Sequence, residues 1–303
     1  YYTDLADAIL QAVIPIVYDH FIQSHGHVTG ASFMVLGMGS LGARSLSSDS
    51  DLDLMMIFDA DPAATSDGPR ALLARPYFAR LTQTIITALT APMRDGRLYE
   101  VDMRLRPSGK AGPVATRIES FDTYQRQEAW TWEHLALTRA RPVAGDPTLM
   151  DRVEQLRRDI LAQKADGATV TADVADMRQR LAQDKPQNGP WDMKNGPGGL
   201  MDMELFAQYQ ALTQRRPDRR VAQQLGTSYG PLADIYTQLT AFKVIHGVLC
   251  KDDGRTTDMG PGAWDVMSDM CQIANMPQLE THMSLLRAKA TAVIDKALAE
   301  QGG

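Results

Sequence analysis

The sequence predicts a mixed α/β domain followed by an all-helical domain, and three observations support this fold class. Strand-like patterns of apolar residues occur three times before residue 107, separated by helical or turn-forming segments. From about residue 146 onward, only the helical spacing of apolar residues recurs. The length of 303 residues is enough for two domains that each bury a core. We therefore predict one domain at residues 1–145 and a second at residues 146–303.

The first domain begins with a helix and a buried strand. Apolar residues recur at helical spacing over residues 5–21, with Pro15 inside the pattern. Proline disrupts a helix interior, so this segment is predicted to form one bent helix or two short helices. The continuous apolar run at residues 33–36 then predicts a buried strand that ends at Gly37.

Two more strands and a helix complete the predicted sheet. Residues 51–59 are wholly apolar from Leu54 to Phe58, which is typical of a strand buried on both faces. Helical spacing follows at about residues 69–91. Residues 98–106 alternate between apolar and charged side chains, as in a strand with one solvated face. These strands are predicted to form a mixed sheet, which is the core of the first domain.

The second domain is predicted to be a helical bundle with one large loop. Residues 185–199 are rich in Gly, Pro and Asn, which are unsuited to a helix interior. A loop of this size in a compact protein is usually functional or mobile. The helical stripes lie around Val153, Leu156 and Ile160, Val174, Met177 and Leu181, Leu232, Leu239 and Phe242, and Leu279, Met283 and Leu286.

Composition excludes several classes of protein. The net charge of −6 argues against a protein that coats nucleic acid through bulk positive charge. The longest apolar runs fall far short of the ~18 residues of a membrane helix, so we predict no membrane span. Cys250 and Cys271 cannot form a disulfide framework, and reduced cytoplasmic thiols are expected. The chain starts without Met or a signal-like pattern, so we expect it to begin inside a longer polypeptide.

A glycine-rich segment follows the first predicted strand. Glycines at positions 37, 39 and 42 match the G-x-G-x-x-G pattern of dinucleotide-binding folds. Only eight residues separate Gly42 from Asp51, where the next strand begins, whereas a parallel crossover needs a dozen or more. A Walker loop is excluded as well, because Ala43 and Arg44 stand where Lys and Ser or Thr are required.

A phosphate site beside a carboxylate cluster fits this segment better. A short helix that begins at Gly39 and Ser40 would present backbone amides and a hydroxyl to a phosphate. Asp51 and Asp53 project from one face of a strand, about 7 Å apart, and supply hard oxygen ligands for Mg²⁺. Asp102 completes a cluster of three carboxylates if its strand is a neighbour. Such a cluster holds two divalent ions ~3.5–4 Å apart for in-line displacement at phosphorus.

Other polar and aromatic residues are assigned secondary roles. Arg104 is a candidate ligand of nucleotide phosphates, because the guanidinium fork suits triphosphate oxygens, and Arg106 and Lys110 are weaker candidates. Asp202 and Glu204 either interact with the dipole at a helix start or help to close the active site. The remaining candidates are interpreted as packing or domain-interface residues: Trp130, Trp132, His134 and, as a satisfied core histidine, His246.

These motifs resemble a known family of enzymes. Gly39 and Ser40, ten intervening residues and then Asp51-Leu52-Asp53 resemble the signature of the nucleotidyltransferase superfamily that includes DNA polymerase β. Residues 98–109 and 195–204 look like motifs of glutamine synthetase adenylyltransferases, which carry two related catalytic halves. Residues 128–141 are similar to the C-terminal half, which adds AMP. This chain departs from the family at Ser40, where lysine is common, and at Ala43, where a glycine is expected.

The resemblance implies a nucleotidyltransferase domain followed by a helical bundle. Its implied activity is transfer of AMP from ATP to a tyrosine hydroxyl of glutamine synthetase, with release of pyrophosphate, in the regulation of nitrogen metabolism. Mg²⁺ is the implied cofactor, and a PII-type regulatory protein is an implied partner of the full-length enzyme. Three alternatives remain open: phosphorolytic removal of AMP at the same site, a non-catalytic nucleotide-sensing module, and a Rossmann oxidoreductase.

Overall fold

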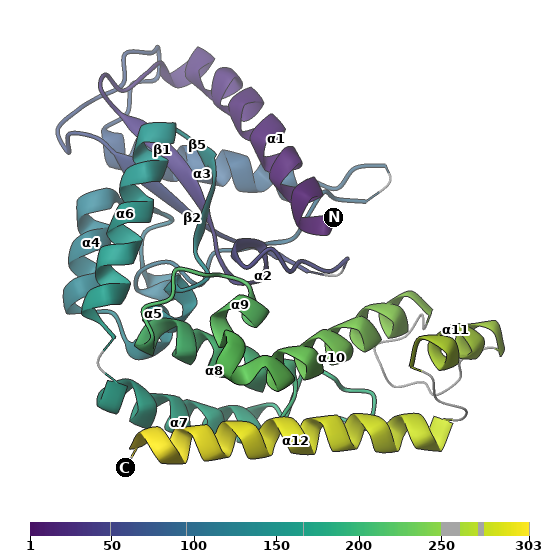
Figure 1. The fold of residues 1–303 in the computed structure, drawn as a ribbon. Coiled ribbons are helices and arrows are strands. Elements are labelled where there is room, and N and C mark those ends of the chain that lie inside the picture. Colours follow the sequence, from purple (N-terminus) through teal and green to yellow (C-terminus); the bar gives the residue numbers. More distant parts are fainter. Residues whose placement is uncertain (49, 95, 166, 250–260, 272–275, 303) are drawn as a thin grey trace. The chain divides into compact units, whose positions relative to one another are not determined.

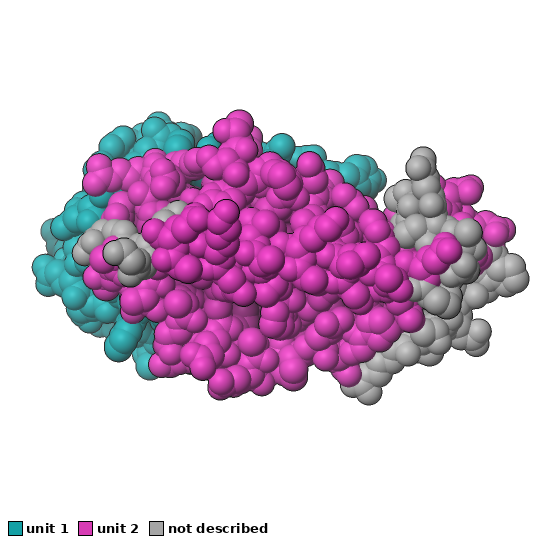
Figure 2. Space-filling view, turned by 60° about the horizontal axis from the view of Figure 1, so that its bottom comes forward, with its two compact units in different colours: residues 1–164, 217–220 teal, residues 165–216, 221–303 magenta. Residues whose placement is uncertain are grey.

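The structure is a computed structural model, and it divides the chain into two units (Figures 1 and 2). Unit 1 consists of Tyr1–Lys164 and Pro217–Arg220, and unit 2 of Ala165–Arg216 and Val221–Gly303. Unit 1 contains a small mixed sheet and unit 2 is helical in its described ranges, so the mixed α/β class is confirmed. The domain boundary at residues 145–146 stays a prediction. The structure describes all residues except 49, 95, 166, 250–260, 272–275 and 303, so Cys250 lies outside the described residues.

Strand β2 (Leu52–Asp59) is central in the sheet of unit 1. On one side it pairs antiparallel with β1 (Ser32–Gly37), which in turn pairs antiparallel with β5 (Arg141–Gly145). On the other side it pairs parallel with β3 (Val101–Asp102) and β4 (Ala115–Arg117). The strands predicted at residues 33–36 and 51–59 are confirmed. The antiparallel pairing of β1 and β2 also rules out a parallel βαβ crossover between them, and with it a Rossmann unit at this position.

The third strand is shorter than the sequence predicts, and two strands were missed. Strand β3 ends at Asp102 because the side chain of Asp102 accepts the backbone N–H of Arg104 at 2.8 Å, which turns the chain. Strand β5 contains Pro142, which has no N–H to donate and weakens the strand pattern. It lies at the edge of the sheet, where a proline is tolerated.

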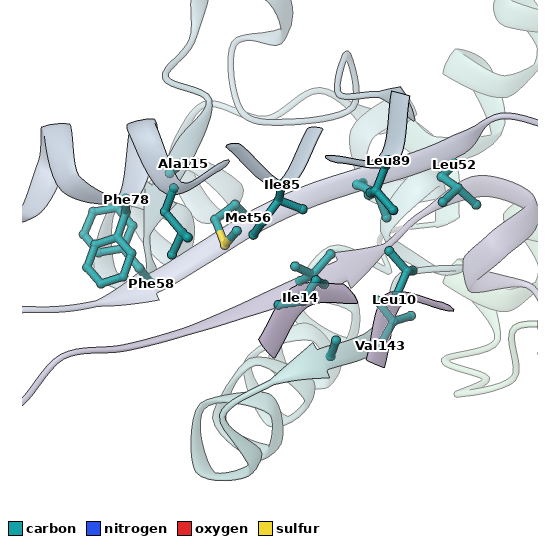
Figure 3. Close-up of a cluster of buried hydrophobic side chains, with 14 of the residues drawn as sticks. Leu10, Ile14, Leu52, Met56, Phe58, Phe78, Ile85, Leu89, Ala115 and Val143 are labelled. Atoms are coloured by element: carbon teal, nitrogen blue, oxygen red, sulfur yellow. The ribbon is translucent and has the colours of Figure 1, made fainter. Parts of the chain in front are cut away.

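One face of the sheet carries the main core of unit 1, between the sheet and two long helices (Figure 3). The inward residues of β2 alternate along the strand, and Phe58 stacks on Phe78 with 4.5 Å between ring centroids. Leu10 and Ile14 reach the same core from the first helix. Burial of each large apolar side chain stabilises the fold by about 1.5–3 kcal/mol. The two helices are α1 (Tyr2–His25), which is a single helix despite Pro15, and α3 (Ala74–Thr90).

The opposite face of the sheet is only partly covered by helices. Met55 and Ile57 point to this face and are buried, and helices that contact β1, β2 and β5 pack there. Asp53 points to the same face near the start of β2 and is only half-buried. This end of the face therefore carries a partly accessible carboxylate. The remaining helices of unit 1 are α2 (Gly39–Gly42), the 3₁₀ turn η1 (Gly109–Ala111), α4 (Ile118–Gln127), α5 (Thr131–Leu137) and α6 (Pro147–Gln163).

Helix α1 is long and apolar enough, by length and composition, to cross a membrane, and it is the one such helix in the described part of the chain. Polar residues interrupt the apolar runs of α1, which is why no single run in the sequence has the length of a membrane helix. One face of α1, including Ala6, Leu10 and Ile14, packs in the core of unit 1. Core helices of this kind meet the same criterion, so the helix is weak evidence for a membrane.

Unit 2 is built from helices around a fixed loop. The loop at residues 185–199 is confirmed as non-helical, and its backbone is held by side chains at both ends. Arg287 donates to the carbonyl oxygens of Asp192 at 2.7 Å and Pro197 at 3.2 Å. The Asp192 carboxylate accepts the backbone N–H groups of Asn188 and Asn195, both at 3.0 Å. The elements are α7 (Gly167–Asp184), α8 (Leu200–Thr213), α9 (Val221–Leu225), η2 (Thr227–Tyr229), α10 (Gly230–Leu249), α11 (Pro261–Cys271) and α12 (Met276–Gly302).

Candidate active site

The first residue of α2 lies directly against a carboxylate of β2. Gly39 has a φ of +51°, and a Cβ atom at this position would lie 2.2 Å from Oδ2 of Asp53. The backbone N–H of Met38 donates to the carbonyl oxygen of Asp53 at 2.8 Å, which fixes the turn to the strand. Both the conformation and the space at residue 39 therefore require glycine. Ser40 follows at the start of this single turn and is half-buried.

Arg141 holds α2 in place, and the sequence reasoning missed its role. Its guanidinium donates to the carbonyl oxygen of Leu41 at 3.0 Å and to the Asp7 carboxylate at 2.8 Å. A Cβ atom on Gly42 would lie 2.1 Å from the carbonyl oxygen of Arg139, so the end of α2 is tightly packed. The sequence shows two arginines, at positions 139 and 141. It does not show the partners of Arg141, because Asp7 and Leu41 are distant in the chain.

Two of the predicted metal ligands lie on neighbouring strands. Asp53 and Asp102 are partners in the parallel register of β2 and β3. Adjacent strands are about 4.8 Å apart, so the two residues are side by side. Asp51 is exposed, and the period of two along an extended chain gives it the side of Asp53. The condition set by the sequence reasoning, that the two strands are neighbours, is met.

Arg104 binds both oxygens of the Asp102 carboxylate. Its Nε lies 2.6 Å from Oδ2 of Asp102, its Nη2 lies 2.5 Å from the same oxygen, and its backbone N–H donates to Oδ1 at 2.8 Å. The hydrogen bond from this side chain holds the pKa of the Asp102 carboxyl below its usual range. The hydrogen bond with Asp102 and the charge of Asp102 raise the pKa of Arg104, and the charges of Asp53 and Asp51 add to this effect. The guanidinium therefore places a positive charge beside the carboxylates of this site.

This arrangement does not assemble the predicted cluster of three carboxylates. In the described ranges, no three side chains of His, Cys, Asp or Glu are placed to hold a metal ion together. The donor set nevertheless fits a hard divalent cation, because carboxylate oxygens at one end of a sheet are the ligands that Mg²⁺ prefers. Oδ2 of Asp102 would be a further donor for such an ion if the Arg104 side chain moved away from it. The metal-binding roles of Asp51, Asp53 and Asp102 stay a prediction.

Arg106 forms hydrogen bonds within the loop that follows β3. Its guanidinium donates to the carbonyl oxygens of Met103 at 2.6 Å, Lys110 at 3.3 Å and Gly112 at 3.3 Å. In the same loop Ser108 adopts a φ of +59°, which is uncommon for a residue with a side chain. Arg106 therefore shapes the loop, whereas Arg104 beside it is 68% exposed and ends on a carboxylate.

The aromatic motif at the start of α5 is only partly a packing motif. His134 is buried, and its Nε2 lies 2.8 Å from the carbonyl oxygen of Gln125, which agrees with a structural role. Trp130 is 73% exposed and Trp132 is 43% exposed, so packing does not account for them. Glu133 anchors this segment through its contacts with the backbone N–H of Trp130 and the hydroxyl of Tyr124.

The acidic residues at the start of α8 hold unit 2 together. Asp202 is buried and receives two hydrogen bonds from Arg178, at 2.6 and 2.9 Å, and one from the backbone N–H of Gly198. Glu204 accepts the hydroxyl of Tyr236 at 2.9 Å. These contacts give both carboxylates a structural role within unit 2, and a role in closing the active site stays a prediction.

His246 is a core residue, but it is not fully satisfied. It is buried and stacks on Trp191 with 5.4 Å between ring centroids. In the described part of the chain its Nε2 has no hydrogen-bond partner, so the interpretation as a satisfied histidine is wrong. Burial lowers the pKa of this imidazole.

Fold and site together define a class: a mixed α/β unit in which a one-turn helix begins against the carboxylate of Asp53 on β2, beside Asp102 on the adjacent parallel strand, and which is joined to a helical unit. Comparison with known families narrows this class. A sequence model of the family described as glutamate-ammonia ligase adenylyltransferase matches residues 1–156, about half of the chain. The chain belongs to this family.

Several relatives share the name bifunctional glutamine synthetase adenylyltransferase/adenylyl-removing enzyme. The protein from Agrobacterium fabrum is 39% identical over the whole of this chain and 32% of its own length. Those from Xanthobacter autotrophicus and Rhizobium meliloti are 47% and 49% identical over 70% and 69% of the chain, and 22% and 21% of their own lengths. The chain thus spans about a third or less of the curated relatives that it matches.

Proposed function

We propose that this chain is a Mg²⁺-dependent nucleotidyltransferase that moves AMP from ATP to a tyrosine hydroxyl of glutamine synthetase and releases pyrophosphate. It represents the AMP-adding half of a cytoplasmic, bifunctional enzyme of nitrogen regulation. In this proposal residues 1–145 form a polymerase β-like nucleotidyltransferase domain and residues 146–303 a helical bundle domain. Glutamine synthetase is the protein substrate, and a PII-type regulatory protein is a further partner of the full-length enzyme.

One observation carries the proposal: Asp53 and Asp102 are register partners on adjacent parallel strands, with Gly39 in contact with Asp53. A phosphate held at the start of α2 is then next to carboxylates that can hold divalent cations. This is the combination that transfer of a nucleotidyl group requires, because the triphosphate must be bound and neutralised beside the attacking group. The names of the relatives support the choice of AMP and of glutamine synthetase.

Each site residue has a distinct role in the proposed reaction. The backbone N–H groups and the hydroxyl at Gly39 and Ser40 bind phosphate oxygens, because the first N–H groups of a helix have no partner within it. Arg104 binds the triphosphate through its guanidinium fork. Asp51, Asp53 and Asp102 would hold Mg²⁺, which neutralises the triphosphate and acidifies the acceptor hydroxyl when bound.

Asp102 is also the proposed base. The phenol of a tyrosine has an ordinary pKa near 10 and is protonated at neutral pH, so its proton must be removed during attack. The attacking oxygen forms a bond to the α-phosphorus, and the bond from the α-phosphorus to the bridging oxygen of pyrophosphate breaks. Asp102 accepts the proton of the phenol in this step.

The test is incubation with Mg²⁺ and ATP labelled at the α-phosphate, with and without glutamine synthetase, followed by measurement of label on protein. We expect label on glutamine synthetase, with a loss of at least about 100-fold in Asp53→Asn, as for removal of a group that stabilises the transition state. Asp59→Asn at the far end of β2 is the matched control and should retain transfer. Transfer that Asp51→Asn and Asp53→Asn leave unchanged would refute the catalytic assignment.

The rival activity is phosphorolytic removal of AMP from modified glutamine synthetase, which the relatives' name also covers. Offering AMP-modified glutamine synthetase and inorganic phosphate to the chain tests this alternative. Formation of ADP would assign the chain to the opposite reaction. Binding of ATP without either reaction would instead identify a nucleotide-sensing module.

A further inference from the structure

We propose that Arg104 is a placeholder for the metal ion: it neutralises Asp102 until a divalent cation binds, and it then exchanges this carboxylate for nucleotide phosphate. The inference rests on the proposed function and adds a coupling between metal and nucleotide that the function does not require. It makes Arg104 a positioning residue with two successive partners. The observation behind it is the occupation of both Asp102 oxygens by one residue.

The geometry makes Arg104 and a cation compete for the same atom. Oδ1 of Asp102 accepts the backbone N–H of Arg104, and this bond belongs to the turn that ends β3. Oδ2 takes no part in the turn, and both Nε and Nη2 of the Arg104 guanidinium lie within hydrogen-bond distance of it. A metal ion that uses Oδ2 must therefore displace the side chain, while the backbone bond and the turn remain.

The surroundings of Arg104 make the exchange easy. The Arg104 side chain is 68% exposed, whereas Asp102 is only 17% exposed, so the guanidinium can leave without disturbing the fold. Water screens the exposed guanidinium and weakens its ion pair with Asp102, and a divalent cation has twice the charge of the guanidinium. The released guanidinium stays close to the site, because its backbone is fixed by the turn. A triphosphate bound at α2 is the anion that it then meets.

Two consequences follow for binding. Metal alone must compete with Arg104, so its affinity for the carboxylates is reduced. Metal together with ATP gives Arg104 a new partner, so removal of Arg104 costs affinity. A variant without the guanidinium should therefore bind metal alone more tightly and metal with ATP more weakly than the native chain.

The experiment measures free Mn²⁺ by electron paramagnetic resonance during titration of the whole chain, first without nucleotide and then with ATP. We expect Arg104→Met to bind Mn²⁺ alone about three- to five-fold more tightly, the range set by an exposed ion pair. With ATP present, we expect Arg104→Met to bind about ten-fold more weakly, because a charge-assisted contact is lost. Lys110→Met is the control, since the charge of Lys110 acts on Asp102 through space.

Each outcome decides a separate point. Opposite changes in Arg104→Met, with smaller changes in Lys110→Met, support the exchange. Equal tightening in both variants would show a general charge effect and overturn it, as would unchanged Mn²⁺ affinity in Arg104→Met. Mn²⁺ binding that Asp53→Asn leaves unaltered would refute the metal site itself, and with it the exchange. If the native chain showed the exchange in Mn²⁺ binding but did not transfer AMP to glutamine synthetase, the proposed function alone would be contradicted.

Discussion

At the scale of single residues, the candidate site depends on close contacts that only certain side chains permit. Gly39 brings the backbone of α2 to the Asp53 carboxylate, and Asp102 uses one oxygen to turn the chain and the other to bind Arg104. The backbone amides at residues 39–40 are fixed by this packing rather than by the side chain of Ser40. A serine at position 40 is compatible with that arrangement.

Replacement of Gly39 by alanine is expected to damage the site more than the fold. The new Cβ would lie 2.2 Å from Oδ2 of Asp53, and alanine disfavours a φ of +51°. We expect a loss of about 1–2 kcal/mol of stability, together with loss of ATP binding measured by calorimetry.

Gly30 provides the matched control for this substitution. It has a φ of +71°, but a Cβ atom at this position would meet no atom of the described residues within 4 Å, so Gly30→Ala carries the strain without the clash. Similar stability loss in the two variants, with ATP binding lost only in Gly39→Ala, is the expected pattern. Intact ATP binding in Gly39→Ala would contradict the role assigned to the start of α2.

At the scale of elements, the sequence predicts those strands and site residues whose positions depend on local patterns of residues. Runs of apolar residues predict β1 and β2. Motif spacing predicts the carboxylates at positions 51, 53 and 102. The length of β3 could not be predicted, because a hydrogen bond from the Arg104 backbone to Asp102 ends it. The occupation of Asp102 by Arg104 was missed for the same reason, since an extended strand would have pointed both side chains to solvent without joining them.

Two buried histidines make the stability of the helices sensitive to acid. Burial lowers the pKa of His134 on α5 and of His246 on α10. The unfolded chain, with an ordinary histidine pKa of about 6.5, therefore takes up protons first as the pH falls. The stability contributed by the neutral imidazoles is complete above that pH and is lost progressively below it.

Urea denaturation followed by circular dichroism at a series of pH values from about 7.5 to about 5 checks this expectation. His134→Gln should reduce the loss of stability between these limits. His20 is exposed, so His20→Asn should leave the pH dependence as it is in the native chain. An unchanged slope in His134→Gln would contradict the assignment.

At the scale of the whole molecule, unit 1 is not a continuous stretch of chain. Pro217–Arg220 belongs to it, although the flanking residues belong to unit 2. Arg219 donates to the carbonyl oxygen of Ala140 at 2.7 Å and pairs with Glu154, while Arg157 donates to the carbonyl oxygen of Pro217 at 3.2 Å. We call the segment Pro217–Arg220 the return, because the chain comes back to unit 1 there. Sequence patterns could suggest two domains but could not predict the return. The residues that the return contacts are distant in the chain and show no periodic pattern.

The ion pair of Arg219 is expected to stabilise unit 1. Burial and the nearby charge of Arg157 lower the pKa of Arg219 to about 10, so the guanidinium remains charged at neutral pH. Arg219→Met should reduce the free energy of unfolding by about 1–3 kcal/mol, because Glu154 and the Ala140 carbonyl lose a partner. Arg220 is exposed, and Arg220→Met should change the free energy by less than about 0.5 kcal/mol in the same thermal and urea measurements. Equal effects of the two substitutions would contradict the structural role of the return.

The return of Pro217–Arg220 also bears on the order in which the protein folds as it is made. Domains tend to fold in turn as the ribosome extends the chain. Residues 165–216 leave the ribosome before the segment that Arg157 and Glu154 require, so unit 1 cannot acquire its last native contacts until part of unit 2 has been synthesised.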